Sequence, residues 1–380
     1  MSRGPLADLR VLDISPFLPG PFGTQMLADL GAVVIKVEPP SGDPARSVPG
    51  GLYETANRNK RGIVLDLKSP TGTAHCQALA AGADVFVEGF RPGAASRLGV
   101  AYEDLRPLNP GLIYCSLSGF GQTGPKRLEP GHDATYLAAA GVLSFPGSWA
   151  DERPRRSGLP MADLAASGYL VVAVLASLRE RDRTGLGGHL DVAIADAALA
   201  LASVRAGAAL DNATADRLHL NPTNDLFDTA DGVIAVGVVE EHFWHRLRDA
   251  LIEDEPALGD TRFDDLARRR QNGDELATML RSVFLRRSTE EWRWRLVQAD
   301  VPVEPVRTVS EAAQTEQTLS RGLVQSSAHD RSHVMFPVLR DGAGMGRLRR
   351  PAPSPGADTA VIIRALDEGA DPWRNAEEAQ

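Results

Sequence analysis

The sequence predicts an α/β protein: a Rossmann-like large domain, with a parallel sheet covered by helices on both faces, followed by a smaller α+β domain. The first 120 residues alternate short β-branched apolar runs with helical stretches. Such near-continuous apolar strands are typical of a parallel sheet that is buried on both faces. The length of 380 residues favours two domains over one.

The first part of the chain contains the strands and helices of the expected sheet. The expected strands are 9–14, 32–37, 62–67, 84–88 and 112–117. Helices are expected over 22–30 and 69–81, because Gly31 and Gly82 follow these stretches and glycine commonly ends a helix. In a sheet of this kind, ligands bind beyond the carboxyl ends of the strands.

From about residue 130 to 205 the sequence becomes helical, with one further strand expected at 190–194. The most apolar run covers residues 164–178 and is closed by Asp163 and Arg179. This run is shorter than a bilayer-spanning helix, so we interpret it as a buried core helix.

The predicted boundaries place the large domain at 1–205, a polar linker at 206–224 and the small domain at 225–320. Within the small domain, residues 227–237 predict two short strands around an Asp-Gly turn. The remaining expected elements are helices in 241–300, an extended X-Pro segment at 301–306 and a last helix at 359–368.

Composition excludes several classes of function. The net charge of −9 and the pI near 5.5 argue against a broad nucleic-acid-binding face. Two cysteines, Cys76 and Cys115, exclude a disulfide framework and a cysteine-based zinc site. The N-terminal residues lack the apolar stretch of a secretory signal, so we expect a cytoplasmic protein without a membrane partner.

Residues 119–124 match the dinucleotide-binding pattern G-x-G-x-x-G and follow an expected strand. Pro125 comes next, no clear helix begins there, and the required acidic residue about 20 positions later is missing. The alternative is a tight loop in which Gly119 and Gly121 allow close backbone approach.

Basic residues recur in loops that follow the expected strands. They are Lys36, Arg46, Arg58, Lys60, Arg61, Arg91 and Arg97. Each of them taken alone is as easily a solvated surface charge. Together they occupy the edge where such a sheet binds ligands, and arginine favours phosphate, so they indicate a phosphorylated anionic ligand.

His132 and Asp163 are the candidates for acid–base or nucleophilic chemistry. His132 precedes a helical run, where the helix dipole favours a neutral imidazole that can accept a proton. Asp163 precedes an apolar helix, where partial burial would raise its pKa toward the useful range. The structural alternatives are a hydrogen-bonding histidine and N-caps at Asp133 and Asp163.

Several segments, in order along nearly the whole chain, resemble the superfamily of family III CoA-transferases and α-methylacyl-CoA racemases. These are residues 5–14, 20–21, 29–38, 42–44, 57–61, 65–68, 90–93, 118–125, 190–192 and 322–323. The resemblance implies an enzyme acting on an acyl-CoA thioester, with coenzyme A as part of the substrate and no permanently bound cofactor or metal. It also implies an interlocked homodimer of ring-like subunits, with the large domain completed by residues from about 325 to 380.

The resemblance also implies roles for individual residues. Asp163 matches the aspartate that accepts the acyl group in the transferases and is kept in the racemases. His132, in Gly131-His132-Asp133, matches the histidine of the racemases, and Glu240 matches the glutamate that supports it. CoA is expected along the basic loops, with its phosphates at the basic groups.

Our main interpretation is a racemase-like isomerase acting on a 2-methylacyl-CoA thioester. His132 and Asp163 would exchange the α-proton on opposite faces of the α-carbon. Backbone N–H groups at the helix start beside Asp163 would stabilise the enolate oxygen. The alternative is a CoA-transferase in which Asp163 forms an anhydride. A third possibility is a CoA-thioester binder without catalysis.

Overall fold

The computed structural model describes residues 4–149, 155–210, 220–326 and 331–374. The chain divides into two compact units. One consists of residues 1–142, 157–202 and 316–380, and the other of residues 143–156 and 203–315. Each unit is described by itself.

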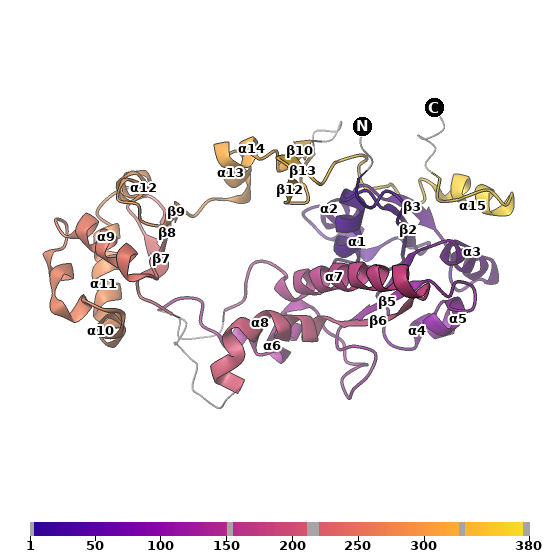
Figure 1. The fold of residues 1–380 in the computed structure, drawn as a ribbon, viewed down its shortest axis with the longest axis horizontal. Helices are drawn as coiled ribbons and strands as arrows, with labels where there is room; N and C mark the ends of the chain where they lie inside the picture. The colour runs from indigo at the N-terminus through magenta and orange to yellow at the C-terminus, as the bar shows by residue number, and fades with distance from the viewer. Residues whose placement is uncertain (1–3, 150–154, 211–219, 327–330, 375–380) are drawn as a thin grey trace. The chain divides into compact units, whose positions relative to one another are not determined.

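The first unit is built on a six-stranded sheet (Figure 1). Its strands are β1 (Arg10–Asp13), β2 (Val33–Glu38), β3 (Arg61–Val64), β4 (Val85–Glu88), β5 (Ile113–Ser118) and β6 (Gly188–Ala193). They lie in the order β3-β2-β1-β4-β5-β6 with all neighbours parallel. The predicted α/β fold with a parallel sheet is therefore confirmed. The order reverses beside β1, which is where sheets of this kind bind ligands.

Helices cover both faces of this sheet. On one face, α1 (Pro19–Asp29) packs against α7 (Met161–Thr184), and α7 also contacts β5 and β6. On the other face, α3 (Pro70–Ala81) contributes Leu79 to a core that includes Phe86 and Tyr114. The Ser69 hydroxyl accepts a hydrogen bond from the N–H of Gly72 and caps α3, and Gly82 ends the helix as expected.

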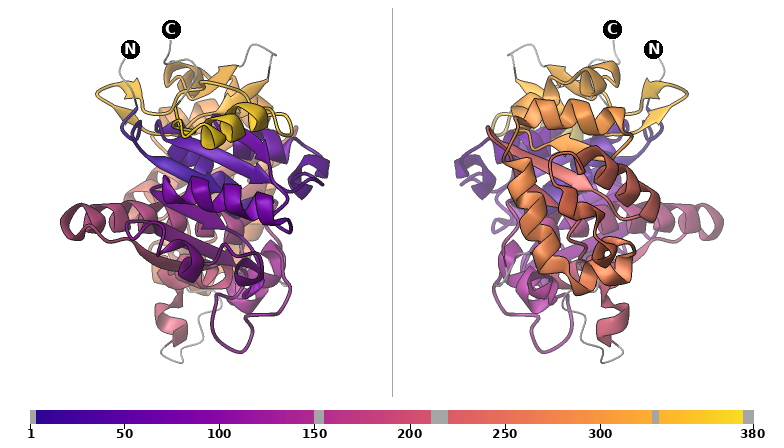
Figure 2. Two further views of the ribbon diagram at one scale, coloured as in Figure 1. Left: turned by 90° about the vertical axis from the view of Figure 1, so that its right-hand side faces the viewer. Right: turned by 90° about the vertical axis from the view of Figure 1, so that its left-hand side faces the viewer.

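The end of the chain returns to the first strands (Figure 2). Helix α15 (Thr359–Asp367) packs against β3 and α3, and Ile362 belongs to the same buried core. Arg10 forms an ion pair with Asp371 at 2.8 Å. Residues far apart in the sequence therefore complete one core.

Helix α7 corrects one prediction. It is 24 residues long, and among the described residues it is the one helix with the length and composition to cross a membrane, although only a third of its apolar window is buried. A helix packed in a soluble core passes the same test. The expected buried helix is thus longer than predicted and only partly covered, because Tyr169, Val172 and Leu175 are exposed.

The second unit contains an antiparallel sheet of β7 (Asn224–Asp228), β8 (Val233–Gly237) and β9 (Val303–Pro305). Trp244 and Trp292 are fully buried in its separate core. The expected hairpin around the Asp-Gly turn is confirmed. The predicted linker is wrong in its first residues, since α8 (Ile194–Leu210) continues through them, and 211–219 lie outside the described residues.

The remaining elements are short. In the first unit they are η1 (Pro44–Ser47), α2 (Leu52–Asn57), α4 (Ala94–Arg97), α5 (Tyr102–Leu105), α6 (Asp133–Ala139), α14 (Glu316–Ser320), β10 (Val324–Ser326), β11 (Ser332–Val334), β12 (Leu339–Arg340) and β13 (Ala343–Gly344). The residues of η2 (Val142–Ser144) span the boundary at which the first unit's residues end and the second unit's begin. In the second they are α9 (Glu241–Leu251), η3 (Pro256–Gly259), η4 (Thr261–Phe263), α10 (Leu266–Gln271), α11 (Gly273–Phe284), α12 (Thr289–Gln298) and α13 (Val309–Ala313).

Candidate functional site

A cavity of about 310 Å³ opens at the carboxyl ends of β1 to β4, beside the point where the strand order reverses. Its walls are mainly apolar, with few polar groups. The residues that line it include Pro16, Leu65, Leu67, Lys68, Phe90 and Leu98. The volume lies at the lower end of the range for small-molecule sites, and the position is where this fold class binds ligands.

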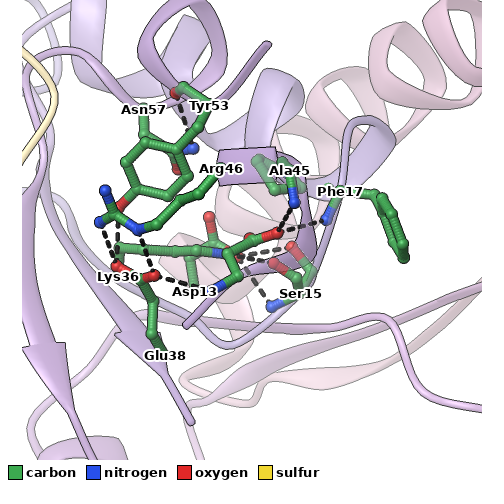
Figure 3. Close-up of polar contacts among 12 residues, drawn as sticks. Asp13, Ser15, Phe17, Lys36, Glu38, Ala45, Arg46, Tyr53 and Asn57 are labelled. Atoms are coloured by element: carbon green, nitrogen blue, oxygen red, sulfur yellow. Dashed lines mark hydrogen bonds and ion pairs between the residues drawn. The ribbon is translucent and has the colours of Figure 1, made fainter. Parts of the chain in front are cut away.

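A buried network of charged side chains adjoins this cavity, and its members Lys36, Glu38 and Asp43 line the cavity (Figure 3). The Lys60 ammonium lies 3.0 Å from the Asp13 carboxylate, and the Lys36 ammonium lies 3.0 Å from Asp43. Burial by itself would raise the pKa of Asp13. The charges of Lys60 and Lys36, with hydrogen bonds from Ser15 and Thr24, instead hold that pKa well below its usual range.

Most of the basic residues expected to meet a ligand point into the protein. Arg58 is buried and binds Asp29 at 2.6 Å. Arg61 is buried near Asp358 and donates to the carbonyl of Pro372. Lys60 is fully buried in the network described above. Their guanidinium and ammonium groups therefore stabilise the fold, and they do not face the cavity as free charges.

Arg46 is also held within the fold. It binds the Glu38 carboxylate at 2.6 Å and stacks over the Tyr53 ring at 3.5 Å (Figure 3). About a quarter of the Arg46 side chain is exposed, and its charge is paired with that of Glu38.

Lys68 and Arg97 are the exposed cations beside the cavity. Both border a second, more open hollow of about 490 Å³. The two hollows share Leu67, Lys68 and Leu98, so they form one continuous surface. Arg97 was among the candidates from the sequence and Lys68 was not, although Lys68 directly follows the strand expected at 62–67.

The first turns of α6 and α7 meet around two carboxylates. Asp133 Oδ1 accepts a hydrogen bond of 2.7 Å from the N–H of Ala162. Burial, and next the charge of Asp133, raise the pKa of Asp163 to about 7. Asp163 is therefore a carboxyl group that gains or loses its proton near neutral pH, as the sequence led us to expect.

The structure corrects three local expectations here. Pro160 is the N-cap of α7, and Asp163 lies inside its first turn. Asp133 caps α7 and not its own helix, whose N-cap is His132. The N–H of Ala162 is occupied by Asp133, and the N–H of Leu164 donates to the carbonyl of Pro160, so these groups are not free to bind an enolate oxygen.

Tyr136 is a buried residue that feels the charges of Asp163 and Arg91, and the sequence alone did not indicate it. Burial, and next the charge of Asp163, raise the pKa of its phenol, while Arg91 acts in the opposite direction. The position of the Tyr136 ring also explains why glycine occurs at positions 119 and 131. A Cβ at Gly119 would lie 2.5 Å from the phenol oxygen, and a Cβ at Gly131 would lie 2.4 Å from the ring.

The G-x-G-x-x-G loop thus has a packing role. Gly119 makes room for Tyr136, whereas Gly121 and Gly124 adopt φ of 82° and 83°, a backbone region that disfavours side chains. Phe120 packs edge-on against the Tyr136 ring. The loop after β5 therefore positions Tyr136, which agrees with the tight-loop alternative to a dinucleotide site.

His132 and Glu240 are both exposed, and they belong to different units. The exposed His132 ring lies edge-on to Phe17, with ring centroids 6.2 Å apart. Glu240 is exposed at the N-terminus of α9 in the second unit. Asp163, Asp133, Tyr136, His132 and Arg91 all belong to the first unit, and the support of His132 by Glu240 stays a prediction.

The chain is similar to proteins of one known family. Residues 6–359 match the family described as CoA-transferase family III. The chain is 32% identical to the mouse succinyl-CoA:glutarate CoA-transferase, covering 97% of this chain and 88% of that protein. It is 36% identical to the acetyl-CoA:oxalate CoA-transferase of Acetobacter aceti, covering 88% of each.

Solved structures give the same result. A CAIB/BAIF family protein from Brucella suis superposes with a TM-score of 0.86 at 29% identity, covering 96% of this chain and 100% of that one. The Rv3272 protein of Mycobacterium tuberculosis superposes with a TM-score of 0.82 at 29% identity, covering 95% and 99%.

Proposed function

This chain belongs to CoA-transferase family III, and we propose that it moves coenzyme A from an acyl-CoA thioester to a free carboxylate, with Asp163 as the nucleophile. The observation that carries the proposal is the Asp163 carboxyl itself, partly buried in the first turn of α7 with its pKa raised to about 7. It combines a nucleophilic oxygen with a partly buried position, and its charge acts on the Tyr136 phenol.

The chemistry needs only this carboxylate and the two substrates. An ionised Asp163 oxygen attacks the thioester carbonyl carbon, and the C–S bond breaks. CoA departs as its thiolate, and an acyl–aspartyl anhydride is formed. The thiolate then attacks the aspartyl carbonyl and releases the first carboxylic acid as its anion. The acceptor carboxylate then attacks the aspartyl–CoA thioester, which expels the thiolate and forms an anhydride between the acceptor and Asp163. The thiolate attacks the acceptor's carbonyl carbon in this anhydride, so that the acceptor leaves as its CoA thioester and the Asp163 carboxylate is restored.

Tyr136 and Arg91 are placed to assist this reaction. A negative charge develops on the carbonyl oxygen when Asp163 attacks, and donors preorganised toward that oxygen lower the barrier. Because the charges of Asp163 and Arg91 both act on the Tyr136 phenol, we propose the Tyr136 hydroxyl and the Arg91 guanidinium as these donors. They replace the backbone N–H groups that sequence analysis favoured.

We place CoA at the cavity beyond β1 to β4. Its apolar walls suit the flat adenine ring, and Lys68 and Arg97 border the adjoining hollow as phosphate partners. Arg97→Ala should weaken CoA binding by about tenfold, since a charge-assisted contact is worth about 1.5–3 kcal/mol.

The main interpretation of the sequence is a racemase, and a CoA-transferase is the alternative. The named relatives are transferases, which favours the second interpretation. A homodimer, the interlocking of its subunits and a cytoplasmic location remain part of the proposal, on the strength of the family resemblance.

The deciding experiment incubates the protein with a chiral 2-methylacyl-CoA and a free carboxylic acid in deuterated water. We expect CoA to appear on the acid, with no deuterium at the α-carbon. Asp163→Asn should abolish transfer yet bind CoA like the unchanged protein, whereas His132→Ala should cost at most about a hundredfold. Deuterium incorporation with inversion, and no transfer, would return the racemase to first place.

A further inference from the structure

Phe17 adopts a backbone conformation that is unusual for its type. Its φ is 63°, in the left-handed region. The other non-glycine residues with positive φ in the described part of the chain are Asn59, Asp300 and Asp341. Asparagine and aspartate tolerate this region, whereas a bulky residue is strained there. The surrounding structure must therefore hold Phe17 in place.

The buried network beside the cavity keeps Phe17 in this conformation (Figure 3). Asp43 Oδ1 accepts hydrogen bonds from the N–H of Phe17 at 3.1 Å and from the N–H of Ala45 at 2.8 Å. Lys36 pairs with the other oxygen of Asp43 at 3.0 Å and donates to the carbonyl of Ser15. The N–H of the strained residue and the carbonyl of Ser15 before it are thus attached to one buried ion pair.

The ring itself is turned away from this network, as Figure 3 shows, and is 40% exposed. It meets the His132 ring edge-on at a centroid distance of 6.2 Å. Two residues later, the carbonyl of Pro19 lies 2.7 Å from the Ser167 hydroxyl, which also lies 2.8 Å from the carbonyl of Asp163. The loop that carries Phe17 is therefore attached to the first turns of both α6 and α7.

We propose that Phe17 selects the acyl group: its ring forms an apolar wall beside Asp163, so that acyl groups with an apolar chain are preferred over dicarboxylic ones. The inference rests on the proposed transfer function. Burying a few methylene groups against the ring stabilises an apolar chain by about 1–3 kcal/mol. A second carboxylate would instead lose water against an aromatic face that is itself negative.

Arg91 is the group that argues for the opposite preference, because its cation would attract a second carboxylate. The relatives named for glutarate and oxalate make a dicarboxylate the natural competitor. Butyryl-CoA and succinyl-CoA are therefore the donors to compare, with acetate as the common acceptor. For the unchanged protein we expect a kcat/KM at least about tenfold higher with butyryl-CoA.

Phe17→Asn removes the ring and keeps a residue that tolerates positive φ. We expect the preference for butyryl-CoA to fall by about tenfold or more, while the Kd for free CoA stays unchanged. Phe17→Leu is the matched control, because it keeps an apolar side chain and should retain most of the preference. If the asparagine variant fails to fold, Phe17→Gly gives the same test, since glycine adopts this φ without strain.

Three results would overturn the inference: a preference of the unchanged protein for succinyl-CoA, an unaltered ratio in Phe17→Asn, or an equal loss with both donors. If the unchanged protein transfers neither donor, the proposed function has failed, and binding decides the role of Phe17. Titration should then show butyryl-CoA binding weakened about tenfold more than succinyl-CoA binding in Phe17→Asn. Equal weakening of butyryl-CoA and succinyl-CoA binding would contradict the proposal that the Phe17 ring contacts the acyl chain.

Discussion

Asp163 is the residue whose charge state we expect to govern both the proposed transfer and part of the stability. Its pKa is raised to about 7 by burial and by the neighbouring Asp133, from a usual value of 3.8. Only the ionised carboxylate is a nucleophile. We therefore expect kcat/KM to rise with pH and to level off above an apparent pKa near 7. A profile that is flat between pH 5 and 9 would contradict this assignment.

The same shift has an opposite effect on stability. Between about pH 4 and pH 7 the folded protein keeps the Asp163 proton that the unfolded chain has lost, so the free energy of unfolding falls as pH rises through this window. Asp163→Asn removes this cost, which is on the order of a few kcal/mol. Its gain in Tm over the unchanged protein should be absent near pH 4 and largest above about pH 7, as thermal denaturation at several pH values will show.

At the scale of elements, two arginines near the cavity have opposite roles. Arg58 joins the segment after α2 to Asp29 at the end of α1, and both side chains are buried. Removing one partner of a buried pair costs about 3–5 kcal/mol because the other charge is left uncompensated. Arg58→Ala should therefore lower Tm by several degrees and leave the Kd for CoA of the folded protein nearly unchanged.

Arg97→Ala is the matched comparison, since Arg97 is exposed beside the second hollow. It should leave Tm unchanged and weaken CoA binding. Isothermal titration together with thermal denaturation separates the two cases. Similar losses of CoA affinity in both variants would show that the segment 57–61 contacts the ligand after all.

At the scale of the whole molecule, the exposed apolar side chains of α7 predict association. Val172 is 65% exposed although the helix is among the most apolar parts of the chain. If this face lies in the homodimer, Val172→Glu should prevent dimer formation, because a charge would be buried without a partner. Val361→Glu, on α15, is the control and should leave the dimer intact. Light scattering that shows a folded monomer for the unchanged protein would reject the proposed dimer.

The sequence by itself determined the order and type of the main elements. Apolar β-branched runs, Gly31 and Gly82 after helices, and the Asp-Gly turn are local signals, and local backbone preference with burial is enough to interpret them. The sequence also indicated Asp163 as a partly buried carboxylate at the start of an apolar helix, although the helix already begins at Met161.

Only the tertiary structure decided which charges are free. Lys60, Arg58 and Arg97 look alike in the sequence, yet Lys60 and Arg58 meet buried carboxylates 47 and 29 residues away, whereas Arg97 stays exposed. Tyr136 and Phe17 acquired their places in the same way, from a glycine loop, a buried ion pair and the first turns of two helices. These contacts join residues that are distant in the chain, and the free energy of pairing or burying a side chain depends on what the fold brings against it.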